Sequence, residues 1–319
     1  MRILFFGIDY HRYTTDIIAE MEAFGAAVTY IDIQPRTLLF KIFRTLARGW
    51  YEAFLKRHHA RALRSVKNIR FDRVVFLQAH QISPGYLDIL RSVQPGARFV
   101  LYNWDSLSTH NYLAQAPYFD EIFTFDSVDA ARHGFRYLPL FASRDMQRLR
   151  NDRSRARAIY MIGNIVNPKR YIAVCAFKNY CRAKGIDFDC FVKITPVVYL
   201  RLLRAALIPR GFSLRSISEK ASHAMAEQSI AVFDFANHQQ SGQTMRMMEN
   251  LCAGKKIVTN NSWVREEPFY SPDRIHVFED LDFSGVSEFL EVPLLDPDAR
   301  FPEYHIQTFV RRLLGIGAQ

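Results

Sequence analysis

Short apolar runs alternate with helical stripes along almost the whole chain, and this alternation limits the fold more than any other feature. Residues 2–6 form an apolar run that ends at Gly7, as a buried strand followed by a turn would. Apolar residues at helical spacing fill 14–24, Gly25 ends that stretch, and 27–33 is strand-like again. A strand–helix–strand order requires a crossover, so the sequence predicts a mainly parallel α/β sheet.

The alternation occurs in two series, which predicts two Rossmann-like domains facing a cleft. In the first series, strands are expected at 73–78, 98–103, 121–125 and 136–138, with helices at 84–93 and 126–133. In the second, strands are expected at 158–162, 187–192, 230–235 and 256–260, with helices at 168–184, 197–207 and 244–252. The expected domains are 1–141 and 158–302, joined by a charged linker at 142–157. The last segment, 303–319, is expected to be helical, and such a tail often returns to the first domain.

Composition indicates a globular protein of the cytoplasm. Hydrophobic residues make up 49% and charged residues 23%, which excludes a disordered, collagen-like or coiled-coil chain. No apolar run approaches the roughly 20 residues of a membrane-spanning helix, and the first residues are a poor signal peptide. The four cysteines lack metal-ligand spacing, so we expect reduced thiols and no metal site.

Positive charge predicts an anionic partner. The chain has 42 Lys and Arg against 32 Asp and Glu, a formal charge of +10. Ten of these cations lie in 36–70 among bulky apolar residues, with Glu52 as the only acid there. Basic helices with bulky apolar residues are typical of binding to an anionic membrane surface, which we expect here. The alternatives are a helix whose apolar face packs on a sheet and, with least support, a nucleic-acid surface.

The segment 241–261 carries the most chemistry. Gly242 is expected to open a helix, and helix N-termini attract phosphate. Arg246 and Glu249 are spaced i, i+3, so both can lie on one side of that helix. The guanidinium could hold a diphosphate and the carboxylate could accept from two ribose hydroxyls. The alternative is an amphipathic helix with an internal Arg–Glu pair.

This segment resembles the donor-binding segment of GT-B glycosyltransferases, especially bacterial enzymes of lipopolysaccharide and capsule synthesis. The family pattern is matched in order by ten residues: Gly242, Thr244, Arg246, Glu249, Leu251, Gly254, Lys255, Lys256, Thr259 and Asn261. The resemblance implies a nucleotide-sugar donor whose ribose binds Glu249. Many retaining members carry a second Glu eight residues earlier, where this chain has Ser241. We therefore expect inversion at the transferred sugar.

The first strand of the second series supplies further donor candidates. It ends at Gly163 and Asn164, where the small residue lets the backbone approach phosphate oxygens. Arg170, and after it Lys169, resemble the cation that meets the donor diphosphate in GT-B enzymes. Lys193, which follows the next strand, is a weaker candidate of the same kind. Solvated charges at a helix start are the alternative for these lysines and arginines.

In the first series, the segment after strand 98–103 is expected to meet the acceptor. Ligands of open α/β sheets bind beyond the carboxyl ends of the strands, and Asp105 follows such an end. Its carboxylate could take the proton of an attacking hydroxyl, while Trp104 could stack on a sugar and Ser106 could bind it. His110 is close in sequence. A helix-capping role for Asp105 is the alternative. Residues 119–131 and 137–141 also resemble the N-terminal domain of the same transferases.

The loop after the first strand is the other place where acceptor chemistry is expected. Asp9 and His11 offer a carboxylate and an imidazole as alternative bases. Gly7 and Tyr10 are expected to contact the acceptor.

Together these features predict an inverting, metal-independent hexosyl- or related sugar transferase without a cofactor. Its expected substrates are a nucleotide-diphosphate sugar and a glycan or lipid-linked acceptor at the cytoplasmic face of the cell membrane. Two other functions stay open. A sugar-nucleotide epimerase can share the fold, and a nonenzymatic basic protein could bind membrane or nucleic acid.

Overall fold

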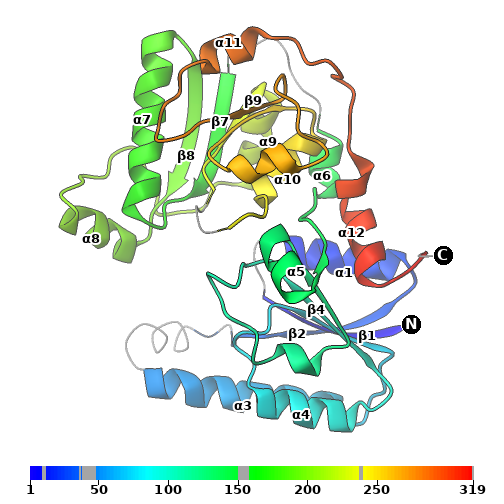
Figure 1. Cartoon of the computed structure of the whole chain (residues 1–319). Coiled ribbons are helices and arrows are strands. Elements are labelled where there is room, and N and C mark those ends of the chain that lie inside the picture. The colour runs from blue at the N-terminus through cyan, green and yellow to red at the C-terminus, as the bar shows by residue number, and fades with distance from the viewer. Residues whose placement is uncertain (9–11, 36, 38–47, 150–157, 237–239, 318–319) are drawn as a thin grey trace. The chain divides into compact units, whose positions relative to one another are not determined.

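The computed structural model describes residues 1–8, 12–35, 37, 48–149, 158–236 and 240–317 (Figure 1). The chain divides into two compact units. Unit 1 combines Met1–Leu140 with Ile306–Gln319, and unit 2 is Phe141–His305. Among the described residues, none of the helices is both long and apolar enough to cross a membrane.

Unit 1 is built on a parallel sheet with the strand order β2-β1-β3-β4-β5-β6. Its central strands are buried on both faces, which explains why they appear in the sequence as uninterrupted apolar runs. Phe6 of β1 stacks on Phe76 of β3 with ring centroids 4.3 Å apart. The strands are β1 Arg2–Gly7, β2 Ala27–Asp32, β3 Arg73–Leu77, β4 Arg98–Asn103, β5 Glu121–Thr124 and β6 Arg136–Tyr137.

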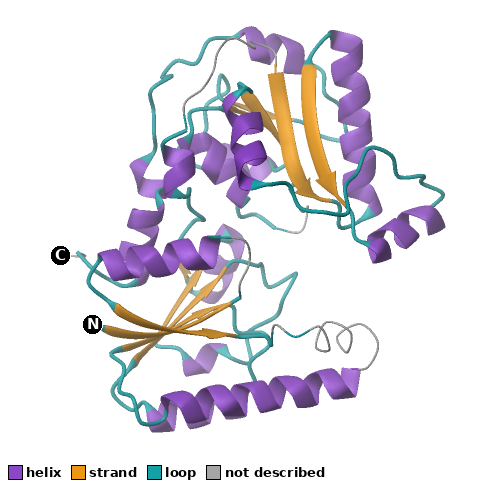
Figure 2. Ribbon diagram, turned by 180° about the vertical axis from the view of Figure 1, so that it is seen from behind, coloured by secondary structure: helices purple, strands orange, loops and turns teal. Residues whose placement is uncertain are grey.

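Helices cover both faces of this sheet. As Figures 1 and 2 both show, α3 and α4 lie on one face and α1 and α12 on the other. The C-terminal helix α12 packs in unit 1: the ring of Phe309 meets that of Tyr102 edge-on at 4.8 Å, and Arg312 donates to the carbonyl of Tyr137. The helices are α1 Tyr13–Ala23, α3 Arg48–Val66, α4 Pro84–Val93, α5 Ser127–His133 and α12 Ile306–Leu313.

Unit 2 has a second parallel sheet, with the order β11-β10-β9-β7-β8. Its core is aromatic: Phe177 of α7 stacks on Phe233 of β9 at 4.0 Å, and Phe283 meets Phe177 edge-on at 4.9 Å. The strands are β7 Ala158–Asn164, β8 Asp187–Lys193, β9 Ala231–Asp234, β10 Lys256–Thr259 and β11 Ile275–Val277. The helices are α6 Arg144–Gln147, α7 Pro168–Lys184, α8 Pro196–Arg204, α9 Glu219–Glu227, α10 Met245–Cys252 and α11 Val286–Glu291.

The predicted α/β class with two Rossmann-like sheets is confirmed, and three local differences have physical causes. α9 was not predicted, because only Ala226 of its nine residues is buried and it therefore lacks an apolar stripe. α8 ends at Arg204, earlier than the predicted 207, because the chain turns there and Leu207 N–H bonds back to the carbonyl of Leu202. α6 lies within the stretch predicted to be a charged linker, where Met146 supplies a buried contact.

The basic stretch 36–70 falls partly outside the described residues, including Arg36, Lys41 and Arg44. Its described part is mainly α3. The buried positions Leu55, His59, Ala62 and Val66 repeat at helical spacing, while the cations between them are exposed. This part of α3 thus has the packed face that the alternative interpretation expected, and membrane binding by 36–70 stays a prediction.

Candidate functional site

The carboxyl ends of three strands meet at one edge of the unit 2 sheet. β7 has β8 on one side and β9 on the other, so the strand order reverses next to β7. In open α/β sheets such a switch point, outside the carboxyl ends, is where ligands bind. The strand ends that meet there are Gly163 and Asn164 on β7, Asp234 on β9 and Thr259 on β10.

Helix α10 starts at this edge. Thr244 is its N-cap: the hydroxyl accepts from the Met247 amide at 3.1 Å and donates to Asp234 Oδ1 at 2.8 Å. The helix therefore begins at Met245, and the expectation that Gly242 opens it was wrong. Gly242 lies two residues before the cap, where its carbonyl accepts from Asn261 Nδ2 at 3.3 Å.

Arg246 joins α10 to two strands. Its Nη1 pairs with Asp234 Oδ1 at 2.9 Å, and its Nε and Nη2 donate to the carbonyl of Ile162 at 3.1 and 2.7 Å. The Asp234 side chain is fully buried and that of Arg246 is 18% exposed. The internal partner of Arg246 is thus Asp234, which was not predicted from the sequence. The available signal was that Asp234 is the only charged residue in the apolar run 230–235.

Gly163 makes room for this guanidinium. A Cβ atom at Gly163 would lie 2.7 Å from Nη2 of Arg246, well inside normal contact distance. Since three hydrogen bonds fix the guanidinium, it has little freedom to move away. The position of Arg246 therefore requires glycine at 163. This reason is separate from the predicted approach of a ligand to the backbone.

Glu249 and Arg246 both lie near Tyr160 of β7. Burial, with a smaller contribution from the charge of Glu249, raises the pKa of Tyr160, and the charge of Arg246 opposes the shift. The Tyr160 hydroxyl donates to Asn250 Oδ1 at 2.8 Å, and Asn250 Nδ2 donates to the Arg246 carbonyl at 2.8 Å. The half-buried Glu249 thus sits on a helix that hydrogen bonds hold against β7.

Two asparagines after β10 fix the loops around this edge. Asn260 bonds to both the amide and the carbonyl of Ala236, at 2.7 and 3.3 Å. Asn261 Nδ2 donates to the carbonyl of Ser241 at 3.3 Å and to Gln243 Oε1 at 3.0 Å. Ser241 is buried and its backbone is held by this contact. The loop before α10 is therefore attached to the end of β10.

The two lysines of the family-like pattern lie at the other end of β10. Because β10 runs from Lys256 to Thr259, Lys255 and Lys256 are at its amino end, opposite the polar edge. Lys255 is fully buried, its Nζ donates to the Ser229 carbonyl at 2.6 Å, and burial lowers its pKa to about 7. Burial also lowers the pKa of Lys256 to about 8; this side chain bonds the carbonyls of Phe289 and Val292. Both lysines therefore support packing.

Of the other donor candidates, Arg170 connects two strand ends, and Lys169 and Lys193 lie close to the edge of the sheet. Arg170 bonds the carbonyls of Asn164, at 3.1 Å, and Phe235, so it joins the ends of β7 and β9. Lys169, one residue earlier on α7, is exposed. Lys193 ends β8 and its Nζ bonds Ser216 Oγ at 2.9 Å. All three lie at or next to the carboxyl edge of the unit 2 sheet.

In unit 1, Asp105 lies beyond the carboxyl end of β4. It accepts a hydrogen bond from Gln78, which follows β3 and has the left-handed φ of 73°. Burial raises the pKa of the Asp105 carboxyl, and the charge of His110 partly opposes this shift. The expected alternative, a helix cap, does not describe Asp105, whose carboxylate bonds the side chain of a neighbouring strand end. A partly buried carboxyl of this kind can act as a general base.

Two histidines accompany Asp105. The rings of His80 and His110 stack with centroids 3.9 Å apart and an interplanar angle of 4°. Burial, and after it the charge of His110, lowers the pKa of His80 to about 4. Neither Gln78 nor His80 was predicted from the sequence as a site residue. Their place just after β3 was the usable signal, since β3 and β4 are neighbours with carboxyl ends at one edge.

Of the remaining acceptor candidates, Ser106 and Gly7 have local structural roles. Ser106 is buried, and its hydroxyl bonds those of Ser108 and Thr109 at 2.7 and 3.3 Å, within the turn that follows β4. Trp104 is half-buried. A Cβ atom at Gly7 would lie 3.2 Å from the ring of Tyr30, so a larger residue would crowd the end of β1. Asp9, Tyr10 and His11 lie outside the described residues.

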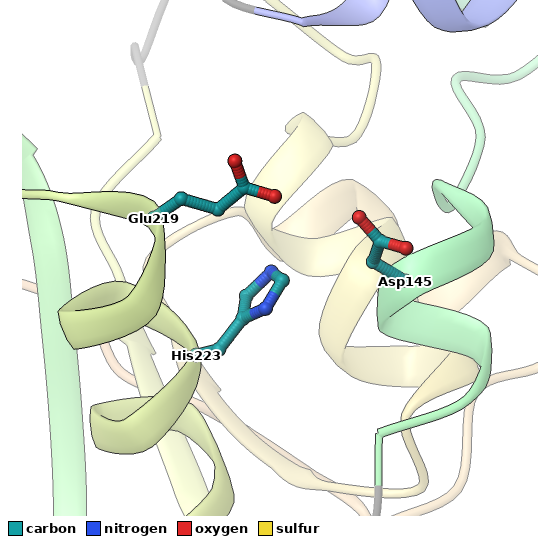
Figure 3. A group of neighbouring side chains, drawn as sticks. All are labelled: Asp145, Glu219 and His223. Carbon is teal, nitrogen blue, oxygen red and sulfur yellow. The ribbon is translucent and has the colours of Figure 1, made fainter.

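One side-chain group in the described part of the chain has metal-ligand character. Asp145 of α6, with Glu219 and His223 of α9, brings three possible ligand atoms within 4.8 Å of one another (Figure 3). Glu219 and His223 are spaced i, i+4, so both point from α9 toward Asp145. Glu219 is exposed, and exposed acidic groups of this kind are common without a bound ion. None of these three residues is among the donor and acceptor candidates described above.

Comparison with known proteins shows the fold. No family model matches the chain, and no curated protein sequence does. Among solved structures, the lipopolysaccharide outer core galactosyltransferase WaaB in its apo form is 13% identical at a TM-score of 0.59, over 99% of both chains. An α-glucosyltransferase in complex with UDP and a 13-mer DNA is also 13% identical, at a TM-score of 0.64 over 98% of this chain and 95% of that one.

A third similar structure belongs to another class of enzyme. The UDP-GlcNAc 2-epimerase from Neisseria meningitidis bound to UDP-GlcNAc is 8% identical at a TM-score of 0.55, over 99% of both chains. The two-unit fold of this chain is thus the one that these glycosyltransferases and this epimerase have in common, the GT-B fold.

Proposed function

We propose that this GT-B chain is a glycosyltransferase that moves a sugar from a nucleotide-diphosphate sugar to a glycan or lipid-linked acceptor in bacterial surface polysaccharide synthesis. The observation that supports this proposal most is the polar edge of unit 2. There the buried Arg246–Asp234 pair holds the start of α10 against the end of β7, within the segment that resembles the donor site of such enzymes.

The donor is assigned to this edge of unit 2. In its contacts with described residues, Arg246 uses three of its five N–H groups on Asp234 and Ile162, and the other two are the ones proposed to bind a phosphate oxygen. The α10 N-terminus and Lys169 add positive potential, and Arg170 is the other candidate cation. Glu249 then accepts from the ribose hydroxyls. The departing nucleotide phosphate is stabilised by these preorganised charges, which is the reason to expect transfer without a metal ion or a cofactor.

The acceptor is assigned to unit 1. Asp105 is the proposed base, because its partly buried carboxyl is positioned by Gln78 and because burial raises its pKa toward the range in which a base works well. Asp9 and His11 are the competing assignments. Inversion is proposed on the identity of residue 241, a serine in this chain. A lipid-linked acceptor would bring the enzyme to the cytoplasmic face of the membrane as a peripheral protein.

A sugar-nucleotide epimerase is the second candidate, since an epimerase has the same fold. It would act on the donor alone and would need acid and base groups but no acceptor.

Product analysis separates the two candidates. The purified chain is incubated with a panel of nucleotide sugars, beginning with UDP-sugars, with and without lipid-linked glycan acceptors. A transferase releases nucleoside diphosphate and produces a glycosylated acceptor, and this continues in excess chelator. An epimerised nucleotide sugar in the absence of acceptor would assign the second candidate, and loss of transfer in chelator with recovery on adding a divalent ion would reject the metal-free mechanism.

A further inference from the structure

The segment that comes after the edge strand β8 in unit 2 exposes several large apolar side chains. Of the side chains between residues 197 and 214, five large apolar ones are exposed: Val197 (57%), Leu200 (56%), Leu203 (41%), Ile208 (67%) and Leu214 (61%). Figures 1 and 2 both show α8 at the margin of unit 2, beyond β8 and α7. Exposed aliphatic residues that are grouped in this way, in contrast to scattered ones, mark an interaction surface.

α8 has two opposed apolar faces. Leu202 is fully buried, and Val198 and Tyr199 pack against the core, so these residues define the inner face. At 100° per residue, Val197 and Leu200 lie on the opposite side of the helix, together with Arg201 and Arg204. A helix that only needed to cover its own domain would carry polar residues there. The outer face instead combines aliphatic and cationic side chains.

The loop after α8 presents its apolar residues from a fixed backbone. The Tyr171 hydroxyl donates to the Ile208 carbonyl and accepts from the Arg210 amide, both at 3.1 Å. The rings of Tyr199 and Phe212 meet at 5.6 Å, which ties the loop to α8. The exposed position of Ile208 is therefore built into the fold.

The charges of the segment that carries these side chains have a single sign. Residues 190–218 contain five cations and no acidic residue. Arg201, Arg204, Arg210 and Arg215 are all exposed among the five apolar side chains. We call these nine residues the α8 patch. Its chemistry fits a partner that is anionic and also accepts aliphatic groups.

We propose that the α8 patch is an interfacial membrane-binding surface that docks unit 2 on an anionic lipid bilayer. Aliphatic side chains enter the acyl boundary while arginines bind the headgroups, and the two contributions add. A nucleic acid fits less well, because single-stranded nucleic acids stack on aromatic side chains and the exposed apolar residues here are aliphatic. A symmetric second copy fits less well, because its four arginines would face four like charges. This proposal does not depend on glycosyl transfer.

Vesicle co-sedimentation of the full-length protein tests the proposal. Wild-type protein should sediment with vesicles that contain phosphatidylglycerol at low salt, bind neutral phosphatidylcholine vesicles much less, and be released as the salt concentration rises. In the double variants Leu200→Ser/Ile208→Ser and Arg204→Gln/Arg215→Gln, the vesicle partition coefficient should fall at least about tenfold. Thermal unfolding of each variant should match wild type, since all four side chains are exposed.

Matched controls identify which surface is responsible. Leu295→Ser removes an exposed leucine of unit 2 outside the patch, and Arg57→Gln/Arg61→Gln removes two exposed cations of α3. Leu295→Ser should keep wild-type binding, and the α3 variant, which tests the separate prediction for 36–70, should keep the binding that the α8 patch supplies. The proposal is overturned if the patch variants bind like wild type, if only the α3 variant is released, if neutral vesicles bind equally, or if wild type binds none. It is also overturned if the patch variants instead lose binding to RNA or lose a dimer that wild type forms.

Discussion

Asp234, at the end of β9, forms an ion pair with Arg246 in the first turn of α10 at 2.9 Å, and the Asp234 side chain is fully buried. The same carboxylate oxygen accepts from the α10 cap, Thr244, at 2.8 Å, and the second oxygen accepts from Thr259 at 3.4 Å. One buried carboxylate thus fixes the position of a helix N-terminus relative to two strand ends. The proposed donor site depends on this arrangement being held before any ligand arrives.

Removing the Asp234 carboxylate should strongly destabilise the folded protein. In Asp234→Ala the guanidinium of Arg246 would stay mostly buried without its ion-pair partner, so we expect the free energy of unfolding to fall by about 3 kcal/mol or more. Asp298→Ala is the matched control, because Asp298 pairs with Arg300 while its side chain is 91% exposed. The control should change stability by less than about 0.5 kcal/mol. Urea unfolding measures the free energy of unfolding of both variants. Equal losses would show that the Asp234–Arg246 pair contributes no more to stability than an exposed pair does.

Gly163 should not tolerate a methyl group. Gly163→Ala places Cβ 2.7 Å from Nη2 of Arg246, and we expect a loss of about 1–3 kcal/mol in stability together with weaker nucleotide binding. Gly96→Ala serves as the control, since a Cβ there meets nothing within 4 Å and its backbone is outside the left-handed region. Unfolding curves and nucleotide titrations of the two variants decide the matter. Wild-type behaviour of Gly163→Ala would mean that Arg246 moves freely.

Burial of Lys255 makes stability depend on pH. Burial lowers its pKa to about 7 in the folded protein, whereas an unfolded lysine titrates near 10.4. Between these values the unfolded chain holds a proton that the folded chain lacks, so the free energy of unfolding rises with pH. From pH 7 to pH 9, wild type should gain about 2 kcal/mol more than Lys255→Met does. Lys220→Met, at an exposed lysine, should keep the wild-type slope, and a Lys255→Met slope equal to wild type would refute the assignment.

Asp105 should be needed for turnover and dispensable for donor binding. Asp105→Asn keeps the side-chain volume but cannot accept the acceptor's proton, so turnover should fall by about 10²-fold or more at unchanged nucleotide affinity. The base must be deprotonated, and burial raises the pKa of Asp105. As the pH is lowered, the wild-type rate should therefore begin to fall at a pH above the usual carboxyl range. Asp9→Asn is the competing variant. An active Asp105→Asn with an inactive Asp9→Asn would assign the base to the first loop.

Much of the fold follows from local patterns, and much of the site does not. The strands of both sheets could be predicted because doubly buried parallel strands are continuous apolar runs, as in β3 and β4. The Arg246–Asp234 pair could not, because twelve residues separate the partners and only the β9–α10 packing brings them together. Lys255 and Lys256 belong to the family-like pattern in the sequence, and their burial could not be predicted from it. The turn at Gly254, with φ of 72°, sends them into the core at the amino end of β10.

Calorimetric titration of a nucleotide panel, with UDP first, into wild type and Glu249→Ala tests the central claim most directly. Wild type should bind at least one nucleoside diphosphate, and Glu249→Ala should weaken that binding by roughly 1.5–3 kcal/mol, the range for hydrogen bonds to a charged group. Glu266→Ala, at an exposed acid of unit 2, should bind as wild type does. Absence of nucleotide binding by wild type, or equal affinity of wild type and Glu249→Ala for every nucleotide bound, would contradict the assignment of the donor site to α10.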